Sequence, residues 1–262
     1  MPDISAVIIT WNEEKHIGQC LESVTNVVDE IVVVDSFSTD HTGEICKQYG
    51  ARFIEHPFEG HIEQKNFALG QASFDHVLCL DADEELSEEM QASVKEVKQK
   101  WTHDAYSFNR LTWYCGKWIR HSTWYPSKKV RLLDRRKAQW EGINPHDCLR
   151  LAPGTSQKHL KGDLLHYSYE TVDEHIQKIV RYAELASQAY YRAGKRSNYV
   201  RMLVNPAWRF LRDYVLELGF LDGRQGLIIA RLSARETFCK YSNIRELYRK
   251  NKKEPSAQEG VH

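Results

Sequence analysis

Short β-branched runs alternate with stretches of helical spacing through the first hundred residues of this 262-residue chain. The runs are typical of strands, and the stretches between them are typical of helices. Such alternation indicates βαβ units, which build a sheet of mostly parallel strands flanked by helices. The predicted strands are Ile4–Thr10, Glu30–Asp35, Ala51–Glu55 and His76–Leu80, and the predicted helices are Glu14–Val24, Thr42–Tyr49, Ile62–Gln71 and Ser87–Gln99. We therefore expect an α/β protein.

Polar residues stand where the predicted strands end. They are Thr10, Asn12 and Glu13 after the first strand, Asp35 at the end of the second, and Asp81 and Asp83 after the fourth. Parallel strands present their carboxyl ends at one edge of a sheet, and α/β sheets bind ligands at that edge. Packing does not account for polar residues gathered there. The sequence therefore predicts the ligand site at this edge.

Asp81 and Asp83 are separated by one alanine directly after an apolar strand. Two carboxylates this close repel each other, and a divalent cation relieves the repulsion. Mg²⁺ or Mn²⁺ typically takes one or two carboxylates together with substrate phosphate oxygens and water. An acidic turn without a ligand is the alternative, but the position after the fourth strand favours a metal. We expect Mg²⁺ or Mn²⁺ as the cofactor.

Asp35 and Lys65 are candidates for contacts to a nucleotide. A carboxylate at the end of a strand suits the hydroxyl or ring-nitrogen donors of a nucleoside. A turn followed by a helix cap would explain Asp40 but not Asp35. Lys65 lies near the start of a predicted helix, where the helix dipole disfavours a cation. A diphosphate is a better partner for Lys65, and a solvated surface lysine is the alternative.

Four segments resemble the successive motifs of the inverting family-2 glycosyltransferases, in order and spacing, over about residues 4–170. They are Val7–Glu14, Val32–Thr42, Gln64–Leu69 and Leu80–Glu84. Later segments resemble a narrower branch, the lipopolysaccharide inner-core β-1,4-glucosyltransferases, up to about residue 250. These are Pro145–Asp147, Leu165–Tyr169 and Leu221–Gly226. The branch usually has His-Glu where this chain has His146-Asp147, so the carboxylate of this chain is one methylene shorter.

The resemblance implies a GT-A-type fold and a nucleotide-sugar donor. The narrower branch implies UDP-glucose, with UDP-galactose or another hexose donor left open. It also implies a lipid-linked or phosphorylated saccharide acceptor, with a lipopolysaccharide heptose as the leading candidate. By position in the motifs, Asp81 would contact the ribose, Lys65 the base and phosphates, and Asp83 the metal. The implied nucleoside contacts are Thr10, Asn12 or Glu13, and Asp35.

Inversion at the anomeric carbon is a single displacement, so the acceptor hydroxyl needs a general base on the face opposite the leaving diphosphate. Asp147 is the candidate base, with Glu141 in reserve. A polar turn at residues 144–147 is the alternative. His166 is a candidate for a further metal ligand. The alternatives are that His146 has this role, or that His166 is only hydrogen-bonded.

Five of the seven tryptophans fall between residues 101 and 140. Aromatic faces stack on sugars, and the nearby lysines and arginines suit a phosphorylated saccharide. We expect Trp118 or Trp124 to face the acceptor, and Trp113 and Trp140 to be buried. A second core under this loop is the alternative.

The chain after residue 170 is helical in its spacing, with Pro206 expected in the first turn of a helix. We expect a glycosyltransferase domain at residues 1–170, a helical extension at 171–250 and a disordered tail at 251–262. Residues 192–253 hold 15 Lys and Arg against 5 Asp and Glu. This excess suggests contact with something anionic, such as a phosphorylated acceptor or the cytoplasmic face of the inner membrane, and a solvated basic face is one alternative. An oligomer interface is the alternative use of these helices.

No run approaches the roughly 18–20 apolar residues of a membrane span. The first strand begins without a signal peptide, and the six scattered cysteines suggest reduced thiols, so we expect a cytoplasmic protein. No nucleic-acid partner is expected. The alternative enzymes are a glycosyltransferase for another cell-surface glycan and a sugar nucleotidyltransferase, but the latter usually has a glycine-rich loop where this chain has Thr10–Glu13. A non-catalytic binding module would not need Asp81, Asp83 and Asp147 together.

Overall fold

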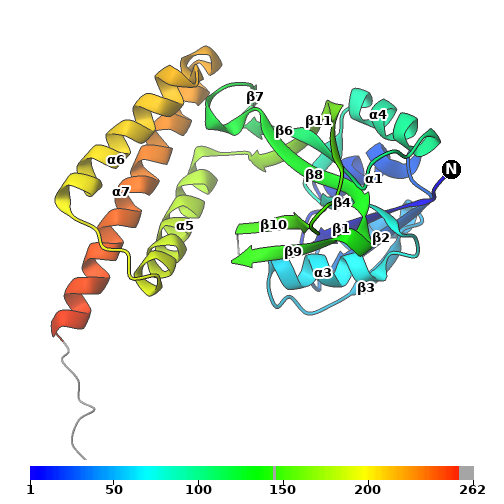
Figure 1. Cartoon of the computed structure of the whole chain (residues 1–262), viewed down its shortest axis with the longest axis horizontal. Coiled ribbons are helices and arrows are strands. Elements are labelled where there is room, and N and C mark those ends of the chain that lie inside the picture. Colours follow the sequence, from blue (N-terminus) through cyan, green and yellow to red (C-terminus); the bar gives the residue numbers. More distant parts are fainter. Residues whose placement is uncertain (144–145, 254–262) are drawn as a thin grey trace, which may run out of the picture. The chain divides into compact units, whose positions relative to one another are not determined.

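The structure is a computed structural model that describes residues 1–143 and 146–253. The chain forms two compact units (Figure 1). Unit 1 comprises residues 1–112 and 126–168, and unit 2 comprises residues 113–125 and those from Tyr169 onward. Unit 2 therefore includes a segment, 113–125, that falls within the first predicted domain. The residues from 254 in the predicted tail lie outside the described part of the chain.

Strands and helices alternate up to Gln99, apart from two consecutive strands at His76–Asp81 and Glu84–Leu86, and a run of strands then precedes the last helices. The strands are β1 (Ile4–Thr10), β2 (Glu30–Asp35), β3 (Arg52–Glu55), β4 (His76–Asp81), β5 (Glu84–Leu86), β6 (Ala105–Tyr114), β7 (Lys117–Ile119), β8 (Ser127–Asp134), β9 (Ala138–Ile143), β10 (His146–Leu151) and β11 (Gln157–Tyr169). The helices are α1 (Ile17–Thr25), α2 (Thr42–Gln48), α3 (His61–Gln71), α4 (Glu88–Gln99), α5 (Val172–Arg192), α6 (Tyr199–Leu211) and α7 (Arg224–Lys253).

The sheet of unit 1 is mixed, and its parallel half is the part that the sequence predicted. Strands β3, β2, β1 and β4 lie in that order and run parallel. Thr10 pairs with Asp35, and Ile9 pairs with Asp81. The carboxyl ends of β1, β2 and β4 are therefore neighbours. Beyond β4 the order continues with β8, β6, β11 and β5, and β8 is antiparallel to both β4 and β6.

Hydrophobic clusters cover both faces of the parallel half. Val33 belongs to one cluster with buried residues of α1, α2 and α4. Val32 and Val34 belong to the other, with α3 and Trp140. A strand buried on both faces needs apolar residues at successive positions, which is the pattern of β2.

The predicted helix starts are right at α4 and wrong at α6. The Ser87 side chain caps α4 by accepting a hydrogen bond from the Met90 amide at 3.3 Å. Pro206 lies inside α6, not in its first turn. The helix begins earlier because the Asn198 side chain accepts from the Arg201 amide at 2.8 Å and caps it. A proline inside a helix removes one backbone hydrogen bond and crowds the carbonyl four residues earlier, yet α6 continues past Pro206 to Leu211.

Unit 2 packs α7 against both α5 and α6. Residues 113–125 join this helical unit through an aromatic cluster around Tyr114, Ile119 and Ile229. The Tyr114 hydroxyl lies 2.9 Å from Nδ1 of His175. Burial, with a smaller effect from Lys178, lowers the pKa of His175 to about 4. The ring is therefore neutral at pH 7 and forms part of the core.

The Leu221–Gly226 segment also has a packing role in unit 2. The Asp222 carboxylate is buried and accepts from the backbone amides of Arg120 and His121, at 3.2 and 2.9 Å. A Cβ atom on Gly226 would lie 1.9 Å from the carbonyl oxygen of Gly219. Only glycine allows the start of α7 to approach that backbone. Among the described residues, no helix is long and apolar enough to cross a membrane.

Gly162 of β11 gives a test of the packing in unit 1. Its φ is +91°, and an added Cβ would lie 2.1 Å from the Met90 backbone nitrogen in α4. Gly154 has φ +80° with nothing within 4 Å of such a Cβ. We expect Gly162→Ala to lower the free energy of unfolding by at least about 3 kcal/mol, through overpacking added to backbone strain. Gly154→Ala should cost only about 1–2 kcal/mol, from backbone strain alone.

Urea denaturation followed by circular dichroism measures both losses on the full chain. The two variants share a left-handed backbone, so the difference between them isolates the contact with α4. Equal losses would mean that α4 moves aside at little cost.

Candidate active site

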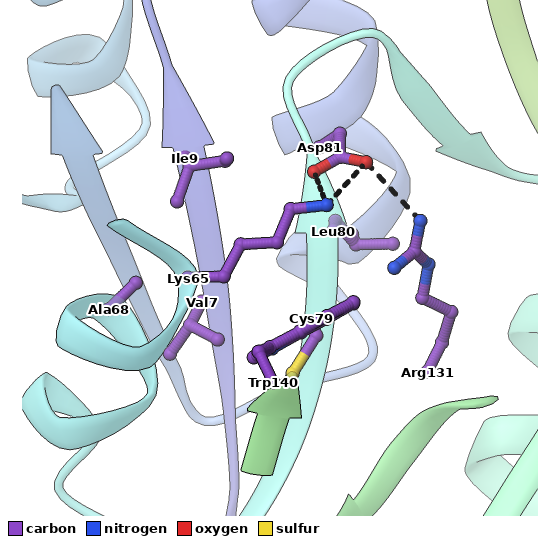
Figure 2. Close-up of a pocket in the computed structure, with 9 residues that line it drawn as sticks. All are labelled: Val7, Ile9, Lys65, Ala68, Cys79, Leu80, Asp81, Arg131 and Trp140. Atoms are coloured by element: carbon purple, nitrogen blue, oxygen red, sulfur yellow. Dashed lines mark hydrogen bonds and ion pairs between the residues drawn. The ribbon is translucent and has the colours of Figure 1, made fainter. Parts of the chain in front are cut away.

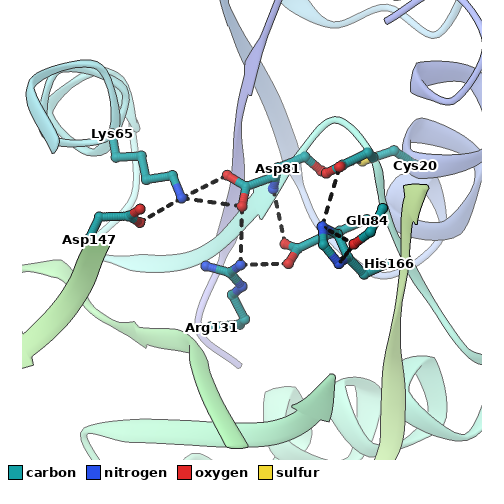
Figure 3. Close-up of polar contacts among 9 residues, drawn as sticks. Cys20, Lys65, Asp81, Glu84, Arg131, Asp147 and His166 are labelled. Carbon is teal, nitrogen blue, oxygen red and sulfur yellow. Dashed lines mark hydrogen bonds and ion pairs between the residues drawn. The ribbon is translucent and has the colours of Figure 1, made fainter. Parts of the chain in front are cut away.

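Five charged side chains form a continuous chain of ion pairs at the strand ends of unit 1 (Figure 3). The Lys65 ammonium lies 2.9 Å from Oδ1 of Asp81 and 2.8 Å from Oδ2 of Asp147. Arg131 Nη2 lies 3.3 Å from Oδ2 of Asp81 and 2.6 Å from Oε1 of Glu84. These side chains come from α3, β4, β10, β8 and β5, so the site joins elements that are far apart in the sequence.

Lys65 is buried, and the alternative of a solvated surface lysine is wrong. Its side chain is 9% exposed, and Nζ lies 4.5 Å from the centroid of the Trp140 ring. Figure 2 shows the side chain crossing beside Val7 and Ile9 of β1 toward Asp81, above the Trp140 ring. Burial favours the neutral amine, but Asp81 and then Asp147 outweigh it and raise the pKa of Lys65. Lys65 is therefore a fixed cation at this edge.

Asp81 stays ionised in this environment. Burial alone would raise its pKa, but the Lys65 and Arg131 cations outweigh burial and hold the pKa well below its usual range. The Asp81 backbone amide also donates to Oε2 of Glu84 at 3.1 Å. Both carboxylate oxygens of Asp81 thus face cations, which fixes the orientation of this side chain.

Arg131 and Glu84 belong to the chain of ion pairs at the candidate site but were not predicted from the sequence. Arg131 is 4% exposed and Glu84 is fully buried. The signal for Arg131 was available, because a charge stands in the apolar strand Val130–Leu133 and a charge buried there needs a partner. The identity of that partner depends on the antiparallel pairing of β8 with β4, which local sequence does not encode.

Asp83 and His166 lie together on the other side of Asp81. Nε2 of His166 is 3.3 Å from Oδ2 of Asp83, and the His166 ring also contacts Oγ of Ser168, 2.6 Å from Nδ1. The pairing of β11 with β5 sets His166 opposite Glu84, and the Tyr167 amide donates to the Asp83 carbonyl at 3.0 Å. The pairing register of β11 therefore places His166 next to Asp83.

Asp83 and His166 suit a divalent ion whose remaining ligands come from the substrate and water. Within residues 1–143 and 146–253, no three His, Cys, Asp or Glu side chains converge as a ready-made metal cage. Mg²⁺ is commonly held by only one or two protein ligands, with phosphate oxygens and water filling the other positions. Asp83 and His166 are close enough to be two neighbouring ligands of one such ion. The side chain of His146, the alternative ligand, lies outside the described part of the chain.

The loops after β1 and β2 hold each other by hydrogen bonds. The Asn12 amide donates to Oγ of Ser38 at 2.7 Å, and the Thr39 amide donates to Oδ1 of Asn12 at 2.8 Å. Asp35 is 1% exposed and accepts from both the amide and the hydroxyl of Ser38, at 2.7 and 2.5 Å. Asp35 therefore orders the loop at this edge, and its contact with a nucleoside stays a prediction.

Thr10 and Glu13 take part in the same two loops. The Glu13 amide donates to Oγ1 of Thr42, at 2.9 Å, which ties the first loop to the start of α2. Oγ1 of Thr10 is buried and has no hydrogen-bond partner among the described residues. The two loops together form a polar rim beside Asp81.

The remaining predicted residues lie elsewhere. Trp118 and Trp124 belong to unit 2, where Trp118 packs against Trp113 with ring centroids 5.1 Å apart and Trp124 joins the Tyr114 cluster. Trp140 is buried as expected, whereas Trp113 is only half-buried. Glu141, the reserve base, is exposed and pairs with Arg150 at 2.8 Å, outside the chain of ion pairs.

Comparison with known proteins assigns this chain to a family. Residues 5–159 match the family model described as glycosyl transferase family 2. The chain is a family-2 glycosyltransferase. An uncharacterised glycosyltransferase of Rickettsia typhi is 31% identical, with 96% of this chain and 90% of that protein covered. A Rhizobium meliloti protein named as the lipopolysaccharide core biosynthesis glycosyltransferase LpsC is 29% identical, over 91% of this chain and 93% of that protein.

Among solved structures, Staphylococcus aureus TarS in complex with UDP matches with a TM-score of 0.47 and 16% identity, covering 95% of this chain and 92% of that one. The family assignment confirms a transferase with a GT-A-type fold and a helical C-terminal part. It also favours the glycosyltransferase over the sugar nucleotidyltransferase and over a non-catalytic binding module.

Replacing Arg131 tests whether the buried ion pairs support this family-2 site. Arg131→Met leaves Glu84 buried without its cation, which typically costs about 3–5 kcal/mol. Arg150→Met is the matched control, because the Arg150 side chain is 69% exposed in its pair with Glu141 and such pairs contribute about 0–1 kcal/mol. Free energies of unfolding from urea titrations check both. A loss below about 1 kcal/mol for Arg131→Met would contradict a paired buried charge.

Proposed function

We propose that this family-2 glycosyltransferase transfers glucose from UDP-glucose, with inversion, onto a heptose of the lipopolysaccharide inner core. The acceptor class is supported by the relationship to LpsC, which extends over nearly the whole of both chains. The donor rests on the resemblance of Leu165–Tyr169 and neighbouring segments to the inner-core glucosyltransferases. The observation that carries the mechanism is the Lys65 ammonium, which lies between Asp81 and Asp147.

When the donor binds, its diphosphate competes with the two carboxylates for the Lys65 ammonium. In the structure, this ammonium contacts one oxygen of Asp147 at 2.8 Å and both oxygens of Asp81, at 2.9 and 3.2 Å. A diphosphate carries more negative charge than a single carboxylate and competes for the ammonium. As Lys65 turns toward the phosphates, the Asp147 oxygen becomes available to accept a proton. The same movement opens Asp81 to a ribose hydroxyl.

Asp147 then acts as the general base. Its side chain is 16% exposed, so it is shielded from solvent but still accessible. It accepts the proton of the acceptor hydroxyl as that oxygen forms a bond to the anomeric carbon, while the bond to the UDP oxygen breaks on the opposite face. The ordered loops that contain Asn12 and Asp35 position the nucleoside. Arg131 keeps Asp81 in place throughout.

Asp83 and His166 would hold Mg²⁺ or Mn²⁺ at the diphosphate. The ion would supply charge neutralisation for the leaving group. Within the protein, the His166–Ser168 contact at 2.6 Å fixes the orientation of the imidazole toward Asp83. This proposal accounts for the polar contacts of His166 without a purely structural role.

A hydrolysis screen of nucleotide sugars tests the donor and the metal together. UDP-glucose should be hydrolysed in preference to UDP-galactose and to other hexose donors when Mn²⁺ or Mg²⁺ is present. EDTA should abolish this activity, and Asp83→Asn should raise the metal concentration needed for half-maximal rate, because a neutral amide is a weaker ligand. Undiminished hydrolysis in EDTA would contradict a metal role for Asp83 and His166.

Asp147→Asn tests the base in transfer assays with a heptose-containing core acceptor. The turnover number should fall about 10²–10⁴-fold, because an amide cannot accept the proton. UDP binding, measured by calorimetry, should be retained. Glu141→Gln is the matched control and should transfer at nearly the rate of the unmodified enzyme, since Glu141 lies outside the chain of ion pairs. A fully active Asp147→Asn enzyme would exclude Asp147 as the base.

A further inference from the structure

One side of α6 is covered by large apolar side chains that are exposed to solvent. Their exposed fractions run from 44% at Leu211 to 65% at Val200. We call this surface the α6 apolar face; it consists of Tyr199, Val200, Leu203, Val204, Trp208 and Leu211 and continues through Val215, Leu216, Leu218, Phe220 and Leu221. Soluble proteins seldom expose so many neighbouring apolar side chains without a binding role.

The spacing of these residues places them on one side of the helix. Tyr199 and Leu203 are four positions apart, and so are the successive members of the series Val200, Val204 and Trp208. The other side of α6 is already used, because α7 packs against this helix. There, Arg209 pairs with the buried Asp213 at 2.6 Å. Most of the apolar face thus lies on the side of α6 that α7 leaves uncovered, and only its first residue, Tyr199, is contacted by Arg245 of α7.

The charges around this face are almost all positive. Basic residues exposed in this part of unit 2 are Arg192, Lys195, Arg196, Arg201 and Arg224. Arg245 of α7 stacks on the ring of Tyr199, 3.4 Å from its centroid. Of the acids between residues 192 and 224, Asp213 and Asp222 are buried, and only Glu217 is exposed. Residues 192–224 thus contribute seven Lys and Arg against three acids to the basic excess, and the exposed charges in this segment, which contains α6, are mostly positive.

We propose that the α6 apolar face inserts into the interfacial region of an anionic phospholipid leaflet. A helix with one apolar side and a basic rim is typical of segments that lie in the plane of a membrane surface. Tyr199 and Trp208 combine a large ring with a polar group, which suits the headgroup level. Anionic headgroups supply the negative charge that the basic rim lacks.

A second copy of the chain fits this face less well. In a two-fold interface the same patch meets itself, so the basic rim of one copy would lie against the basic rim of the other. The exposed Glu217 alone does not balance those cations. Charge complementarity therefore favours lipid, and this conclusion does not depend on the donor or the acceptor.

The test is flotation of the full chain with vesicles of phosphatidylcholine, with and without phosphatidylglycerol. The unmodified protein should float with the anionic vesicles at low salt and bind them about tenfold less after a rise to high salt. The double substitution Leu203→Glu with Trp208→Glu should reduce binding about tenfold or more, because it places charge in the apolar layer. Val180→Glu, at an exposed apolar site of α5, is the matched control and should bind as the unmodified protein does.

Three outcomes would overturn the proposal. The first is an unmodified chain that does not bind the anionic vesicles at low salt. The second is an equal loss of binding in Val180→Glu and in the double variant. The third is a dimer in light scattering that the double variant converts to monomers while vesicle binding stays unchanged, which would assign the face to a second copy. Equal thermal unfolding midpoints verify that the variants are folded.

Discussion

The arrangement of unit 1 around its site depends on the Asp81 carboxylate being held by two buried cations. Lys65 reaches it from α3 and Arg131 reaches it from β8, so one side chain at the end of β4 connects the helix on one face with the antiparallel half of the sheet. Burying charge is costly unless each charge is paired with good geometry. Each of the two cations touches two carboxylates, and the Trp140 ring lies against both, at 4.5 and 5.6 Å. The site residues are therefore also structural residues.

The parallel half of this sheet could be predicted because the sequence patterns that specify its strands and helices lie within short segments. β-branched runs, helical spacing and the polar residue after each strand are properties of short segments, and four motifs in register fixed the family. The predicted carboxyl ends of β1, β2 and β4 agree with the structure to within one residue. Which strand lies beyond β4 is a long-range choice. The pairing of β8 with β4 brings Arg131 to Asp81, and nothing near residue 131 or residue 81 specifies that contact.

Side-chain environments were harder to predict than elements. Trp140 was expected in the core, yet no sequence signal indicated that its ring packs against the Lys65 side chain. The need for a carboxylate predicts Asp147 as the base, but its ion pair with Lys65 joins residues 82 positions apart and has no local signal. At Pro206 a local rule favoured a helix start, but the Asn198 cap and the contact with α7 prevailed. In each case the deciding partner lies far away in the sequence or on another element.

Dissolved salt affects the charges of the two units to different extents. In unit 1, Lys65 and Arg131 are almost inaccessible, so dissolved ions screen their interactions weakly. In unit 2 the rim of the α6 apolar face is exposed, and its attraction to an anionic surface weakens as ionic strength rises. Salt therefore acts on surface attachment while leaving the geometry around Asp81 intact. A change in activity that appears with salt only when the acceptor is embedded in vesicles belongs to unit 2, because the buried ion pairs of unit 1 are the same in both assays.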